Sequence, residues 1–81
     1  MNWISVKHRL PTEEESMREC FIVTVEIDIC GNISREVYCD VGYGRSGWYD
    51  YDSEYEIVIP IERNSTKVVA WAFSPEPYQG E

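Results

Sequence analysis

The chain has 81 residues, the length of one small domain, so we expect a single core over residues 1–81 and no linker. Fifteen acidic residues against seven basic ones give a net charge of −8. This balance argues against direct nucleic-acid binding, because every phosphate contact needs local cations. No run approaches the ~18 apolar residues of a membrane span, and the first residues do not resemble a signal peptide. The sequence therefore predicts a cytoplasmic protein that does not bind membranes.

The cysteines carry no sign of a metal or disulfide framework. Cys20, Cys30 and Cys39 are odd in number, nearly evenly spaced and without a C-x-x-C pair. They fit neither a closed set of disulfides nor a four-ligand zinc site. We interpret them as small, half-buried residues in strands, and we predict no metal and no cofactor.

The first two elements along the chain are short. Residues 3–6 can supply a brief strand. After Pro11, Thr12 and Glu15 have the spacing of a capping box, with acidic residues in the first turn. This segment predicts a helix of one or two turns.

The clearest signal is a pair of alternating segments. Residues 20–30 and 33–41 both alternate apolar and polar side chains with a period of two, which predicts two half-buried strands joined as a hairpin. A three-residue loop with Asn32 left-handed would pair Ile29 with Ile33 and Phe21 with Val41. A two-residue turn at residues 31–32 would separate these apolar residues, so we prefer the longer loop. The three-residue loop also sets Glu26 opposite Glu36, and this pair of like charges is mildly unfavourable.

The rest of the chain adds two strands and a tail. Residues 55–61 form a third candidate strand. Because Pro60 has no N–H to donate to a neighbouring strand, this strand either ends at Pro60 or lies at an edge of the sheet. A turn at residues 63–66 leads to a strand over residues 67–73, and residues 74–81 form an extended tail. The sequence thus predicts a mainly β fold, a small antiparallel sheet or partial barrel of about five strands with one short helix; α+β is the alternative class.

Two further expectations follow from this pattern. The predicted core consists of Trp3, Val23, Val25, Ile27, Val37 and Trp71. A chain of this size buries a limited core, and an edge strand at Pro60 leaves backbone groups free. We therefore predict a homo-oligomer.

Motifs for catalysis and for common ligands are incomplete. Residues 42–47 read G-x-G-x-x-G, but no helix pattern follows, so a flexible or bulged loop is expected rather than a dinucleotide site. Asp50, Asp52 and Glu54 copy the start of a calcium loop that lacks its glycine and its final glutamate. His8 is the only histidine and lies in a polar stretch. The sequence predicts no enzyme and no catalytic residues.

The aromatic segment 43–55, together with the adjoining Glu56, carries two alternative binding sites. Aromatic planes beside an arginine can stack a base and pair with a phosphate. This reasoning gives a candidate ligand site of Tyr43, Arg45, Trp48 and Tyr49. An acidic surface that blocks a nucleic-acid-binding protein is the alternative, with Asp50, Asp52, Glu54 and Glu56 as its candidate residues. A third interpretation is that Trp48 and some of the tyrosines close the core.

The two ends of the chain carry a further pattern. Residues 3–11, WISVKHRLP, match a W-I-S-V-x-x-R-L-P opening, residues 47–49 match a Gly-x-Trp-Tyr-like element, and residues 68–77 match the closing V-T-H-W-M-P-L-P-E-P-P in part. About 25 positions in all resemble the phage and prophage family catalogued as domain of unknown function 551. Ala70 stands where that family usually has histidine, and Phe73 where it has proline, so no role of the family histidine carries over.

The resemblance implies a viral, phage or prophage origin and a bacterial host cytoplasm, with no established activity. Small phage accessory proteins without evident chemistry are often antagonists of host functions. The predicted function is therefore antagonism of host antiviral defence by stoichiometric capture of a small nucleotide-type ligand. The alternative is an acidic, nucleic-acid-mimicking inhibitor of a host protein.

Overall fold

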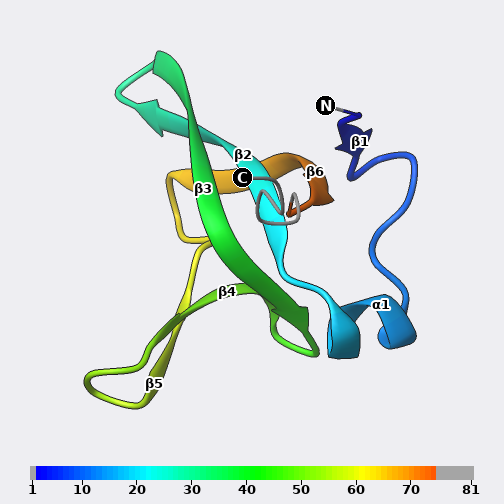
Figure 1. Cartoon of the computed structure of the whole chain (residues 1–81). Coiled ribbons are helices and arrows are strands. Elements are labelled where there is room, and N and C mark those ends of the chain that lie inside the picture. The colour runs from blue at the N-terminus through cyan, green and yellow to red at the C-terminus, as the bar shows by residue number, and fades with distance from the viewer. Residues whose placement is uncertain (1, 75–81) are drawn as a thin grey trace, which may run out of the picture.

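The computed structural model describes residues 2–74, which form one antiparallel sheet of six strands with a short helix at its side (Figure 1). The elements are β1 Ile4–Ser5, α1 Glu13–Arg18, β2 Phe21–Ile29, β3 Asn32–Gly44, β4 Gly47–Asp52, β5 Ile57–Pro60 and β6 Thr66–Phe73. Their order in the sheet is β1-β6-β2-β3-β4-β5, and the sheet is not closed. The mainly β prediction is confirmed. Most of the predicted tail, 75–81, lies outside the described residues, and within 2–74 no helix has the length and apolarity to cross a membrane.

The predicted helix and its cap are present. Thr12 accepts a hydrogen bond from the Glu15 N–H at 3.1 Å, and the Glu15 carboxylate accepts one from the Thr12 N–H at 2.8 Å. Arg9 completes the start of the helix, with its Nη1 2.9 Å from Glu15 Oε1. The same arginine lies over the Trp71 ring, and its carbonyl accepts a hydrogen bond from Trp71 Nε1 at 3.0 Å. Arg9 therefore ties α1 to the centre of the sheet.

Replacement of Glu15 by glutamine is expected to reduce stability in a pH-dependent way. The hydrogen bond from Arg9, then that from the Thr12 backbone, lowers the pKa of Glu15 from its ordinary 4.5 to about 2. Since the folded-state pKa is lowered, this contribution is fully present above about pH 4.5 and is lost as the pH falls toward 2. Urea denaturation should show a gap between wild type and Glu15→Gln at pH 7 that closes at pH 2. Glu14→Gln, which removes an exposed pair with Arg18, should show little difference at either pH.

The β2–β3 hairpin has a different register from the one predicted. Its turn is the two-residue Cys30-Gly31, with φ of 53° and 84°, so Ile29 pairs with Asn32 and not with Ile33. Left-handed angles at both turn positions match the right-handed twist of the flanking strands. The observed register also places Glu26 opposite Arg35, with Arg35 Nη2 3.2 Å from Glu26 Oε2, and so avoids the predicted Glu26–Glu36 pair.

A bulge in β3 restores the predicted pairing further along. Between the pairs Val23–Tyr38 and Phe21–Val41, β3 has one extra residue, and Asp40 adopts a φ of 55°. The Phe21–Val41 pair is therefore as predicted, although the pairs nearer the turn are not. The bulge bends β3 and sends its last residues toward β4.

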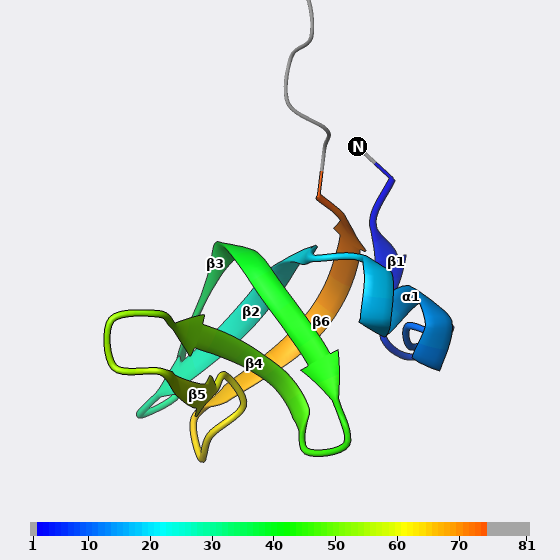
Figure 2. The same ribbon diagram turned by 60° about the horizontal axis from the view of Figure 1, so that its bottom comes forward.

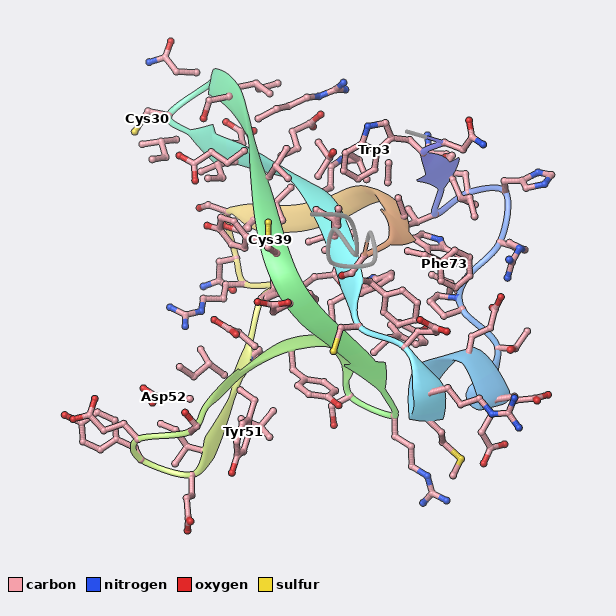
Figure 3. All side chains as sticks on the ribbon, in the orientation of Figure 1. Trp3, Cys30, Cys39, Tyr51, Asp52 and Phe73 are labelled. Carbon is pink, nitrogen blue, oxygen red and sulfur yellow. The ribbon has the colours of Figure 1, made fainter. Side chains whose placement is uncertain are left out.

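The core forms around Trp71 and is partly the predicted one. Its buried residues are Phe21, Val23, Val25, Val41, Trp48, Ile61, Val68 and Trp71. Val23, Val25 and Trp71 are confirmed, and Ile27 is half-buried against this cluster. Two predicted core residues are wrong. Val37 is 56% exposed because it pairs with Thr24 and not with the buried Val25, in a stretch, 32–40, that is exposed throughout. Trp3 is 40% exposed because Ile4, its neighbour in β1, takes the inward face. Figure 3 shows Trp3 beside β1.

Two other expectations need correction. Residues 42–47 are not a flexible or bulged loop, because β3 continues to Gly44 and β4 begins at Gly47, forming a second tight hairpin. The three cysteines are exposed rather than half-buried, and Figure 3 shows Cys30 at the hairpin tip and Cys39 along β3. The predicted edge at Pro60 is confirmed, since β5 ends there and is the last strand of the sheet.

Candidate ligand-binding site

A hollow of about 730 Å³ lies between α1 and the β3–β4 hairpin. Figure 2 shows the tight turn of this hairpin beneath α1. The lining residues are Pro11, Glu13, Ser16 and Met17 on the helix side and Tyr43, Gly44, Arg45 and Tyr49 on the hairpin side. The volume is within the ~300–1,000 Å³ range of small-molecule sites. Three of the four residues predicted for the ligand site therefore meet in one place.

The two tyrosines are held by their neighbours in the sheet. Tyr43 packs against Trp48, with ring centroids 4.7 Å apart. Tyr49 pairs with Gly42, and its ring lies directly over that glycine. Both tyrosine side chains are half-buried, so each keeps part of its surface open to the hollow. They provide an aromatic wall on which a planar group can lie.

Arg45 provides the positive charge of the hollow. It lies in the two-residue turn between Gly44 and Gly47, and its side chain is exposed. Among residues 2–74 it belongs to none of the ion pairs, whereas Arg9, Arg18 and Arg35 are each paired with a glutamate. Glu13 lines the opposite, helical side. The hollow thus has a cationic end and an acidic end.

Trp48 occupies a different position from the other three predicted site residues. It is 3% exposed and packs against Phe21 and Trp71 in the core. It also borders a smaller hollow of about 390 Å³ that shares Arg45 and Tyr49 with the larger one. Because its ring faces are covered, Trp48 supports the tyrosine wall from behind, and the third interpretation of the aromatic segment holds for this residue.

Substitution of Gly42 by alanine is expected to displace the Tyr49 ring. A Cβ at this position would overlap the ring and lie 2.6 Å from its hydroxyl oxygen, so the tyrosine must move away. Gly44→Ala is the matched control, because its Cβ would lie 3.5 Å from the same ring, an ordinary contact. We expect the fluorescence and the NMR shifts of Tyr49 to change in Gly42→Ala and to stay near wild type in Gly44→Ala. Equal changes in both variants would contradict this packing.

The alternative acidic residues gather on the β4–β5 hairpin. Asp50, Glu54 and Glu56 are exposed, and Asp50 pairs with Ile59 in the ladder. Asp52 is partly used by the fold, since its Oδ1 accepts hydrogen bonds from the N–H groups of Glu54 and Tyr55. Figure 3 shows Asp52 where this hairpin projects from the sheet. Three of the four carboxylates are thus free to meet a partner.

The helical half of the hollow has no signal in the sequence. Glu13, Ser16 and Met17 lie in α1, which the sequence predicts only as a helix of one or two turns, with no sign that it faces a ligand. Arg9 sets the position of that segment, since it contacts both Glu15 and Trp71. Such long-range contacts do not follow from spacing. Comparisons of the chain with protein-family models, with curated proteins and with solved structures found no match, so the resemblance to domain of unknown function 551 stays a prediction.

Proposed function

We propose that this chain is a non-enzymatic phage or prophage protein that captures a small nucleotide-type ligand between α1 and the β3–β4 hairpin. The observation that carries the proposal is the hollow itself, which joins Tyr43 and Tyr49 to Arg45, an arginine that makes no ion pair within residues 2–74. Aromatic side chains can stack against any nucleobase, and arginine binds phosphate through charge-assisted hydrogen bonds.

The polarity of the hollow supports one orientation of such a ligand. Arg45, at the turn, attracts the phosphate. Glu13, on the helix, repels a phosphate but accepts hydrogen bonds from the amino groups of a base. The base would therefore lie along Tyr43 and Tyr49, with its phosphate toward Arg45. With a net charge of −8, the protein as a whole repels anions, so phosphate binding depends on the local positive charge of Arg45.

A role against host defence rests on the resemblance of residues 3–11 and 68–77 to the phage family. A protein that sequesters a nucleotide signal acts by stoichiometry and needs no catalytic residues. Its effect would depend on its abundance relative to the ligand. The compartment of such action would be the bacterial cytoplasm.

A ligand screen tests this function directly. The protein is titrated with mono-, di- and cyclic nucleotides, with nucleosides and inorganic phosphate as controls, by thermal shift and calorimetry. At a free ligand concentration of about 100 times the dissociation constant, binding stabilises the fold by about 2.7 kcal/mol, which is readily measured as a rise in Tm. We expect a response to at least one nucleotide that exceeds the responses to nucleoside and phosphate. No response to any nucleotide would exclude capture.

A second function is favoured by the exposed carboxylates of Asp50, Glu54 and Glu56 on the projecting β4–β5 hairpin. A surface of this charge can occupy the basic site of a nucleic-acid-binding host protein. Its signature is a stoichiometric complex that is lost in the triple variant Asp50→Asn, Glu54→Gln, Glu56→Gln. Nucleotide binding should be unaffected in that variant, since none of these residues lines the hollow.

A further inference from the structure

Among residues 2–74, no strand pairs with the long outer side of β3 before Gly42. On its other side β3 pairs with β2 over most of its length, whereas β4 pairs only with residues 42–44. Figure 1 shows β4 turning away from β3 beyond this short ladder. Residues 32–40 are all exposed, including the apolar side chains of Ile33 and Val37. An exposed edge with apolar side chains is a template for a further strand.

The backbone of this edge presents hydrogen-bonding groups at every second residue. The Asp28 N–H donates to the Ser65 carbonyl at 2.8 Å, on the β6 side of β2. Successive residues of a strand direct these groups to opposite edges, so Val23, Val25 and Ile27 direct theirs toward β3. The β3 residues that receive them are Ser34, Glu36 and Tyr38. The residues that direct their groups outward are therefore Ile33, Arg35, Val37 and Cys39.

The other two edges of the sheet are poor templates. β1 has only two residues. In β5, the Ile61 N–H donates to the Trp48 carbonyl at 3.0 Å, which places Pro60 on the outward side. Proline has no N–H to offer there. Within the described part of the chain, the outer side of β3 is therefore the one long enough for a ladder of several residues.

The charges along β3 select a second copy of the same strand in one register. Two identical antiparallel strands related by a two-fold axis bring one residue opposite its own copy. An axis at Arg35 or Glu36 sets like charges opposite each other, and an axis at Tyr38 sets Glu36 opposite Asp40. An axis at Val37 opposes Arg35 to Cys39 and Glu36 to Tyr38, which avoids every like-charge pair. Axes at Ser34 and at Cys39 avoid such pairs too, but the first runs into the turn at residues 30–31 and the second into the bulge at Asp40, so the axis at Val37 gives the longest ladder.

We propose that the chain forms a homodimer by antiparallel pairing of its β3 edges about a two-fold axis at Val37. The outward groups of Arg35, Val37 and Cys39 would supply about six backbone hydrogen bonds. The paired stretch is residues 35–39, which stops before the bulge at Asp40. The two Val37 side chains meet at its centre. This interface is separate from the hollow at α1, so it goes beyond the proposed function and does not depend on it.

Sedimentation equilibrium tests the dimer with a matched pair of variants. Wild type should show twice the chain mass of 9.5 kDa, and its dimer should tighten with added NaCl because salt screens the repulsion of two copies of charge −8. Val37→Lys places two like charges opposite each other and should weaken the dimer more than about tenfold. Val58→Lys is the control, since Val58 is equally exposed, at 58%, but lies on β5. A monomer at high micromolar concentration in 0.5 M NaCl, or greater sensitivity to Val58→Lys, would overturn the proposal.

Disulfide trapping tests the register. In a chain whose Cys20, Cys30 and Cys39 are replaced by serine, Val37→Cys would oppose its own copy at a Cα separation of about 5.5 Å, within disulfide range. Oxidation should link this variant into dimers. Glu36→Cys is the control, since it opposes Tyr38 and should stay monomeric on a denaturing gel. Linking of Glu36→Cys in preference to Val37→Cys would contradict the axis at Val37.

Discussion

Replacement of Trp71 by alanine is expected to remove most of the stability of this domain. Trp71 is fully buried and contacts Phe21 and Phe73, with ring centroids 5.3 and 5.4 Å apart. Truncation of a buried tryptophan costs about 3–5 kcal/mol through lost burial and the cavity left behind. It also removes the hydrogen bond to the Arg9 carbonyl and the surface under the Arg9 guanidinium, so α1 should loosen as well.

Urea denaturation followed by circular dichroism measures this loss, and Trp3→Ala is the matched control. Trp3 is 40% exposed, so its removal should cost well under half as much, although the sequence marks both tryptophans as core residues. A domain of this length has about 4–12 kcal/mol of stability, so Trp71→Ala is expected to be partly unfolded at 37 °C. Equal losses from the two variants would contradict the described arrangement of the core.

Replacement of Arg45 by alanine is expected to weaken nucleotide binding about 10- to 100-fold while the fold stays intact. A hydrogen bond to a charged group contributes about 1.5–3 kcal/mol, and Arg45 is the cation that lines the hollow. Because its side chain is exposed in a turn and makes no ion pair among residues 2–74, its loss leaves the core unchanged. Calorimetric titration with the nucleotide identified by the screen gives the affinity.

Lys7→Ala separates this local effect from general charge. Lys7 is exposed near β1, does not line the hollow, and its removal changes the net charge by the same one unit. The affinity of the Lys7→Ala variant for the nucleotide should stay within about twofold of wild type, since salt screens an exposed charge at a distance from the ligand. If Lys7→Ala weakens binding as much as Arg45→Ala, the ligand responds to overall charge and does not occupy the hollow.

Local patterns in the sequence are sufficient to predict the helix and every strand except β4. The alternation of residues 20–30 predicted β2, because a half-buried strand must alternate. Thr12 and Glu15 predicted the helix start, since a capping box is satisfied within four residues. Pro60 predicted the end of the last strand of the sheet, because a missing N–H acts locally. Each of these signals depends only on neighbours in the chain.

The strand register, the β3–β4 hairpin and the hollow depend on residues that are distant in the sequence, so they are visible only in the tertiary structure. The register of β2 and β3 follows from the Cys30-Gly31 turn, the Glu26–Arg35 pair and the bulge at Asp40 together, and in this register Val37 pairs with Thr24 and lies at the surface. The hairpin of β3 and β4 was missed because its glycines and tyrosines resemble a loop until they pair. The helical side of the hollow exists only because Arg9 joins Glu15 to Trp71, a residue 62 positions away. Pattern alone cannot fix such contacts, since their free energy arises from the packing of segments that are far apart in the chain.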